Sequence, residues 1–288
     1  DPQRGVLEQL PDDVIVMGDY ERGEMTEACG FAYKNDEYSI KVIGPSPRFT
    51  GVAEFQRERG LPVYAKVQIG TTHENPNIPY LPTLQKIARK WQTLVESGTT
   101  GMMTCWNFGN MSSLGTEVAG EMTFAPQPSV EEAVLAVATR HFGPEAAPHM
   151  VAGWQQLCTA QDDFTTSIPV MYYGPISRGP AFHFVFDRRD QKFPRSWLLD
   201  NNLDGDRLDW AGPFGPEKTL ECYRAVARQW AEGIEIMREG LPKAQGAQLD
   251  AMQREITLAA FCLTQLVSSA NVVEFLLARD AYYASGDA

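Results

Sequence analysis

The run Pro62-Val-Tyr-Ala-Lys-Val-Gln-Ile-Gly70 decides how the first part of this chain folds. It is short, apolar, rich in β-branched residues and bounded by proline and glycine, a pattern typical of a buried strand. Three further runs of this kind lie upstream and downstream, at residues 14–18, 38–44 and 101–107. The sequence therefore predicts four strands.

Helical patterns separate the later strands. Residues 84–97 repeat apolar side chains at helical spacing, and Thr83 and Gly98 suit the two caps. Residues 49–59 form a shorter candidate helix before the third strand. This alternation predicts an α/β fold with a parallel sheet and right-handed crossovers. The acidic residues 19–37 have no helical stripe, and we expect them to connect the first two strands irregularly.

The pattern changes to helices from Ser129 onward. Ser129-Val-Glu-Glu132 is a capping box, which marks the start of a helix. Four helices are expected, at residues 129–141, 147–160, 217–240 and 248–283. The last is unusually long, so we expect a kink or break near Ser268-Ser269. Residues 164–216 are dense in proline, glycine and aromatics and are expected to form a long loop region.

Composition excludes several classes of function. Lys plus Arg number 25 against 37 for Asp plus Glu, a net charge of −12. Partners that are bound through phosphates need clustered cations, so we expect neither a nucleic acid nor an anionic membrane surface as a partner. No run of 18 apolar residues occurs, and the sequence therefore predicts no membrane span. The sequence starts at Asp1-Pro2 without a basic and apolar leader, so any targeting signal has been removed or lies upstream, and the compartment stays open.

Motifs for cofactors and metals are absent from the sequence. The five cysteines stand singly, which fits neither a zinc site nor a disulfide framework. There is no Gly-rich phosphate loop, no H-E-x-x-H and no G-x-S-x-G. We therefore expect no cofactor.

Polar and aromatic side chains follow each predicted strand. Because ligands of parallel α/β folds bind beyond the carboxyl ends of the strands, these positions are the candidate site. They are Asp19 and Glu21 after the first strand, Arg48 after the second, His73, Glu74 and Tyr80 after the third, and Trp106 and Asn107 at the end of the fourth. Carboxylates and amides pair with hydroxyl groups, and a flat ring covers the apolar face of a pyranose. This mixture predicts a carbohydrate ligand.

The same residues carry a resemblance. A strand that ends in Trp106, preceded by one whose exit loop carries Glu74, resembles the last four units of a (β/α)8 glycoside hydrolase. The chain is also similar to bacterial proteins grouped loosely with family 20-type hexosaminidases and related barrel glycosidases. The similar segments are Leu10-Pro-Asp-Asp-Val, Gly70-Thr-Thr-His-Glu, Met102-Met-Thr-Cys-Trp and Pro169-Val-Met-Tyr-Tyr-Gly-Pro. The resemblance covers about the first 110 residues. It implies that residues 1–125 are the C-terminal half of a TIM barrel, followed by an α-helical domain at residues 126–288.

The resemblance also implies a division of catalytic roles. Such enzymes carry the general acid after the fourth barrel strand, which would lie upstream of Asp1 if the four strands here are strands five to eight. Glu74 would then be the second carboxylate or a ligand for substrate hydroxyls. Glycoside hydrolysis needs two carboxyl groups, roughly 5 to 5.5 Å apart for retention and roughly 6.5 to 9.5 Å for inversion. Within the chain, Asp19 or Glu21 is the available partner for Glu74. His73, Tyr80, Trp106, Asn107 and Arg48 are the expected substrate-binding residues.

Each assignment has a structural alternative. Glu74 can equally be a solvated loop carboxylate, and the neighbouring acids Glu24 and Glu27 favour that interpretation for Asp19 and Glu21. His73 can orient Glu74 or a loop carbonyl instead of transferring protons. Trp106 can fill the end of a barrel core. The aromatics Tyr172, Tyr173, Trp197 and Trp210 are expected to be core rather than a sugar platform.

One segment partly matches a calcium-binding loop. Asp200, Asn202, Asp204 and Asp206 are spaced as the first oxygen ligands of such a loop. Its twelfth position is Ala211 instead of a bidentate glutamate. An Asx-rich turn is therefore the favoured interpretation, and we expect no metal site.

Together these observations predict a glycoside hydrolase-like protein that uses carboxylates for acid and base catalysis. Four strands are too few to close a barrel, so we expect either a fragment that lacks the first barrel half or a homo-oligomer. The alternative is a carbohydrate-binding or scaffolding protein without catalysis. A barrel enzyme of another class is a third possibility.

Overall fold

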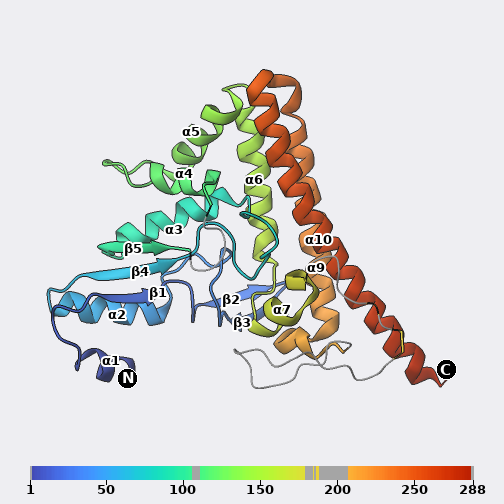
Figure 1. Ribbon diagram of the computed structural model, residues 1–288, viewed down its shortest axis with the longest axis horizontal. Helices are drawn as coiled ribbons and strands as arrows, with labels where there is room; N and C mark the ends of the chain where they lie inside the picture. The colour runs from blue at the N-terminus through green and yellow to red at the C-terminus, as the bar shows by residue number, and fades with distance from the viewer. Residues whose placement is uncertain (1, 106–110, 179–183, 185, 188–206, 287–288) are drawn as a thin grey trace.

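A computed structural model describes residues 2–105, 111–178, 184, 186–187 and 207–286. It has an α/β region at the N-terminal end, followed by long helices (Figure 1). The α/β class and the change to helices are thus confirmed.

A parallel sheet of three strands forms the centre of the first region. Its order is β1 (Val16–Asp19), β4 (Val63–Val67) and β5 (Gly101–Thr104). The crossovers contain α2 (Pro47–Glu58) and α3 (Leu84–Glu96), as the sequence predicts. Within the described residues the sheet is open and does not close into a barrel.

The strand predicted at residues 38–44 is wrong. This segment is irregular, and β1 pairs directly with β4. Its backbone groups are bound by buried side chains: the carboxylate of Glu74 accepts from two amides, and Lys86 and Lys90 donate to two carbonyls. A strand ladder is therefore not needed to satisfy this buried backbone.

A hairpin takes the place of the expected irregular connection at residues 19–37. Strands β2 (Met25–Ala28) and β3 (Phe31–Lys34) pair antiparallel. Cys29 and Gly30 form the two-residue turn between them and both have positive φ, the geometry that suits a tight hairpin.

Helix α2 packs closely on the sheet at a glycine. A Cβ on Gly18 of β1 would lie 3.0 Å from the ring of Phe49, so the missing side chain lets the helix approach. The opposite face of the sheet carries Asp19, Lys66 and Tyr64, since Cα partners in adjacent strands point to the same side. This leaves polar side chains of β1 and β4 on the face away from α2.

The helices predicted after Ser129 all form. The capping box starts α5, with the Ser129 hydroxyl accepting from Glu132 N and the Glu132 carboxylate accepting from Ser129 N. The remaining helical elements are α1 (Pro2–Leu7), α4 (Leu114–Glu121), α5 (Val130–Phe142), α6 (Ala147–Asp162), α7 (Ile168–Tyr173), α8 (Pro175–Arg178), η2 (Asp209–Phe214), α9 (Gly215–Arg238), η3 (Leu241–Lys243) and α10 (Gly246–Ser285).

Helix α10 runs without the break expected at Ser268-Ser269, so that prediction is wrong. The buried hydroxyl of Ser269 donates to the carbonyl of Gln265 at 2.8 Å, which satisfies the side chain within the helix. By length and composition alone α10 could cross a membrane, but half of its most apolar window is buried inside the protein. Glu255 and Arg279 are buried charged side chains on the same helix.

Helices α6 and α9 pack through two glycines. A Cβ on Gly153 would lie 2.9 Å from the carbonyl oxygen of Gly233, and one on Gly233 would lie 3.1 Å from that of Gly153. The helices therefore approach too closely for larger residues. Figure 1 shows α6, α9 and α10 side by side as a layer next to the sheet.

We expect Gly153→Ala to lower the free energy of unfolding by about 1 to 3 kcal/mol, because the added methyl group meets the backbone of α9 and the side chain of Met237. Gly120→Ala is the matched control, since nothing lies within 4 Å of the added atom. The control should be neutral or more stable by up to about 1 kcal/mol. Chemical denaturation of both variants measures the difference, and equal stabilities would contradict the close packing.

Candidate functional site

The carboxyl ends of β1 and β4 bring a carboxylate and an ammonium group together. Asp19 and Lys66 are Cα partners, and Lys66 Nζ lies 3.9 Å from Asp19 Oδ1. The same ammonium lies 3.1 Å from the ring centroid of Tyr38, a cation–π contact. Burial lowers the pKa of Lys66, while Asp19 opposes this shift.

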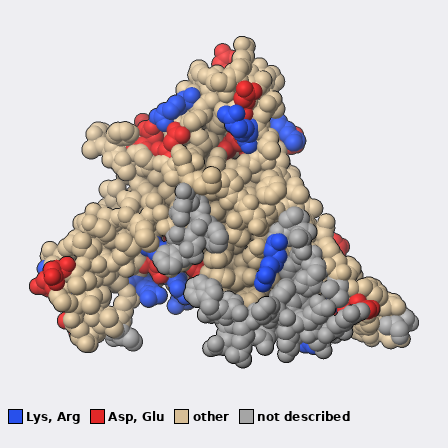
Figure 2. All heavy atoms as spheres, in the orientation of Figure 1, with Lys and Arg blue, Asp and Glu red and all other residues tan. Residues whose placement is uncertain are grey.

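Three further side chains extend this group. Glu37 accepts from the backbone amide of Tyr38 at 2.8 Å and from the hydroxyl of Tyr172 at 2.9 Å. The rings of Tyr172 and His73 lie 3.8 Å apart at 30°. We call Asp19, Glu37, Tyr38, Lys66, His73 and Tyr172 the strand-edge cluster. Figure 2 shows acidic and basic side chains gathered in a hollow at this end of the sheet.

The electrostatics of the cluster favour neutral hydrogen-bonding groups beside its carboxylates. Burial lowers the pKa of His73 to about 4, so the imidazole is neutral at pH 7. Burial, together with the negative charges of Asp19 and Glu37, raises the pKa of Tyr38 to about 12. The pKa of Tyr172 is raised for the same reasons, with Glu37 as its charged neighbour. Phenol, imidazole and carboxylate groups of this kind can bind several hydroxyl groups at once.

Asp19 also lines a pocket outside the strand-edge cluster. It lines a pocket of about 210 Å³ between α1, β1 and α2, together with the exposed Arg48. The structure thus brings together two of the residues that the sequence nominated, Asp19 and Arg48. His73 lies in the strand-edge cluster as well.

Glu74 lies behind this cluster and is 1% exposed. Its carboxylate accepts from Ser39 Oγ at 2.5 Å, from the amides of Ile40 and Lys41 at 3.1 and 3.3 Å, and from Gln161 Nε2 at 3.2 Å. Burial raises its pKa, and these hydrogen bonds oppose the shift. Every donor comes from the protein itself, and three of the four belong to residues 38–44.

Glu21 is also fully buried. Its Oε1 accepts from Lys90 Nζ at 2.7 Å and from the amide of Gln68 at 2.8 Å, and Lys90 donates in addition to the carbonyl of Ser39 at 2.5 Å. Removal from water raises the pKa of Glu21 and lowers that of Lys90, while their mutual attraction opposes both shifts.

Two further lysines complete this layer. Lys86 donates to the carbonyl of Lys41 at 3.2 Å and to Asp162 at 2.5 Å. Lys41 Nζ donates to the carbonyl of Phe164 at 2.8 Å, and burial lowers its pKa to about 8. We call Glu21, Lys41, Glu74, Lys86 and Lys90 the buried charge network. It holds residues 38–44 in place, and Tyr38 of the strand-edge cluster is the first residue of that segment.

The other nominated residues lie elsewhere. Tyr80 is not part of the strand-edge cluster, because its hydroxyl donates to Glu255 of α10. Trp106 and Asn107 are outside the described residues, as are the calcium-loop candidates Asp200, Asn202, Asp204 and Asp206. Among the residues that the structure describes, no three His, Cys, Asp or Glu side chains come together as a metal site.

Sequence reasoning missed Glu37, Tyr38 and Lys66. The one available signal was Lys66, a cation in the middle of an otherwise apolar strand, where a charged residue is costly unless it has a partner. Tyr172 was expected to be core, and it contacts both Glu37 and His73.

Comparison of the chain with known protein families, curated proteins and solved structures finds no match in any of the three. The resemblance to glycoside hydrolases therefore stays a prediction.

We expect Lys90→Met to lower the free energy of unfolding by about 3 to 5 kcal/mol, because it leaves the Glu21 carboxylate and the Ser39 carbonyl buried without their cation. Arg238→Met is the control, since Arg238 forms an exposed pair with Glu235, and it should cost less than about 1 kcal/mol. Urea denaturation compares the two. If Lys90→Met lowered the free energy of unfolding as little as the control does, the buried charge network would not hold residues 38–44.

The buried carboxyl of Glu255 gives a pH-dependent prediction. Burial raises its pKa from the ordinary 4.5 to about 7. Between these values the unfolded chain has released the proton that the folded protein keeps, so this group makes stability fall as pH rises. In thermal unfolding from pH 5 to pH 8, we expect Glu255→Gln to gain stability relative to the wild type as pH rises. A constant difference across this range would contradict the shift.

Proposed function

We propose that the protein binds a carbohydrate at the strand-edge cluster and acts there as a glycoside hydrolase-like enzyme. The observation that carries this proposal is the juxtaposition of Asp19 and Lys66 at the carboxyl ends of two parallel strands, with Tyr38 against them. Ligands of parallel α/β sheets bind at this edge.

The chemistry of the cluster suits a polyhydroxylated ligand. The side chain of Asp19 is only partly buried, at 20% exposure, so its carboxylate can reach a substrate. The paired rings of His73 and Tyr172 are partly exposed and offer a flat surface, and the exposed Arg48 is a charged donor at the pocket that Asp19 also lines. Asp19 is therefore our candidate for the carboxylate that acts as nucleophile, base or charge stabiliser.

Glu74 and Glu21 have a different part in this proposal. Both carboxylates are buried. Glu74 accepts hydrogen bonds from the protein through both oxygens and Glu21 through Oε1, so we assign them the positioning of residues 38–44. Glu37 is buried as well, so the second carboxyl group that glycoside hydrolysis needs would then come from further strands.

The open sheet fits the idea of an incomplete barrel. Three parallel strands with helical crossovers match successive units of a (β/α)8 barrel, and β1 and β5 are its outer strands within the described residues. We propose that additional strands complete the sheet, supplied by further chain or by a second copy of this one.

A non-catalytic carbohydrate-binding protein is the second candidate. It is favoured by the complete burial of Glu21 and Glu74, which leaves Asp19 as the one accessible carboxylate among the three nominated from the sequence.

Turnover of a panel of aryl glycosides tests the assignment of Asp19. We expect Asp19→Asn to lower kcat/KM by at least about 100-fold on any substrate that the wild type cleaves, because it removes the charge without changing the shape. The exposed Asp12→Asn is the control and should leave turnover unchanged. Unchanged turnover in Asp19→Asn would show that Asp19 is not a catalytic residue. Calorimetric binding of an oligosaccharide without any cleavage would favour the second candidate.

Glu74→Gln separates positioning from catalysis in the same assay. In the positioning role, this variant unfolds at lower denaturant concentration and keeps kcat within about tenfold of the wild type, since the reacting groups remain. A loss as large as that of Asp19→Asn, with unchanged stability, would make Glu74 a catalytic residue instead.

A further inference from the structure

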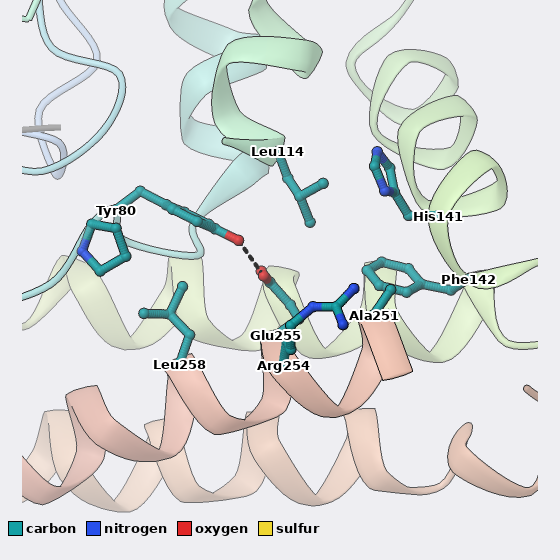
Figure 3. Close-up of a pocket in the computed structure, with 9 residues that line it drawn as sticks. Tyr80, Leu114, His141, Phe142, Ala251, Arg254, Glu255 and Leu258 are labelled. Carbon is teal, nitrogen blue, oxygen red and sulfur yellow. Dashed lines mark hydrogen bonds between the residues drawn. The ribbon is translucent and has the colours of Figure 1, made fainter. Parts of the chain in front are cut away.

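A second pocket lies far from β1, where the loop that follows β4 meets three helices (Figure 3). Its volume is about 310 Å³, near the lower end of small-molecule pockets. The lining residues are Pro79, Tyr80, Leu114, His141, Phe142, Ala251, Arg254, Glu255 and Leu258. They come from the loop, α4, α5 and α10, so the pocket exists only in the folded protein.

The floor of this pocket is a buried carboxyl group. Glu255 is 3% exposed, and its two oxygens accept separately, one from the hydroxyl of Tyr80 and one from Trp154 Nε1 at 3.0 Å. Burial raises its pKa to about 7 in spite of both donors. A carboxyl group with a shifted pKa that lines a cleft is a candidate for a functional site.

The mouth of the pocket carries a cation. Arg254 is exposed, and within the described part of the chain its guanidinium forms no ion pair or hydrogen bond. Figure 3 shows the guanidinium on the Phe142 side of Glu255, over the pocket. His141 is engaged instead, because its Nε2 lies 2.9 Å from both carboxylate oxygens of Glu117.

The walls between the mouth and the floor are mainly apolar. Leu114, Phe142, Ala251 and Leu258 line them. A ligand that fits this arrangement has an anionic group that pairs with Arg254 and an apolar body. It needs no cation to pair with Glu255, because that carboxyl group already accepts two hydrogen bonds. A carboxylate binds a guanidinium through two parallel hydrogen bonds.

We propose that this pocket binds a small organic carboxylate with an apolar body. Its carboxylate pairs with Arg254, and its apolar part packs against Leu114, Phe142 and Leu258 above the Tyr80–Glu255 hydrogen bond. This site is separate from the strand-edge cluster and does not depend on the function proposed there.

Calorimetry with benzoate and its uncharged analogue benzamide tests the proposal on the full chain. We expect benzoate to bind at least about tenfold more tightly than benzamide, because only benzoate can pair with Arg254. Arg254→Gln should lower benzoate affinity at least about tenfold and remove this preference. Arg89→Gln, an exposed arginine of α3 outside the pocket, should leave both affinities unchanged.

A second variant fills the pocket. Leu258→Trp should weaken benzoate and benzamide alike, and circular dichroism checks that this variant and Arg254→Gln remain folded. Equal binding of the two probes by the wild type, unchanged benzoate affinity in Arg254→Gln, or no benzoate binding tighter than about 10 mM would each overturn the proposal.

Discussion

The carboxylate of Glu74, which accepts from the backbone of Ile40 and Lys41, is the interaction on which the candidate site depends. Residues 38–44 belong to no strand or helix, and residues 39–42 are buried, so their polar groups need partners from side chains. Glu74 binds their amides, and Lys86 and Lys90 bind their carbonyls. An unpaired buried charge is costly, so the lysines and carboxylates of this network depend on one another.

The buried charge network and the strand-edge cluster form two layers, and residues 38–44 connect them. The buried layer fixes residues 38–44, and the outer layer places Tyr38 against Lys66 and Glu37 against Tyr172. Parallel pairing of β1 with β4 supplies the remaining geometry, since it sets Asp19 beside Lys66. Preorganised binding requires functional groups that a buried layer holds in fixed positions.

Part of this arrangement can be predicted from the sequence. The apolar runs that became β1, β4 and β5, and the stripes and caps of α3 and α5, are local signals that tertiary contacts reinforced. The run at residues 38–44 carries the same signal, but its backbone partners come from residues 74, 86 and 90, which no local pattern reveals. Asp19 and His73 lie at the sheet edge, as predicted from their positions after strands. Glu74 also follows a strand, but its side chain is buried, because Ser39 and two amides bind it there. The pocket formed by Tyr80 and Glu255 joins residues 175 positions apart and has no sequence signature.

Amide hydrogen exchange at Ile40 and Lys41 tests most directly whether buried charges hold residues 38–44. The account predicts that both amides exchange as slowly in the wild type as those of β4 (Val63–Val67), although they belong to no strand or helix. In Glu74→Gln, they should exchange much faster while the amides of β4 keep their protection. Rapid exchange of Ile40 and Lys41 in the wild type, or protection that Glu74→Gln leaves unchanged, would contradict it.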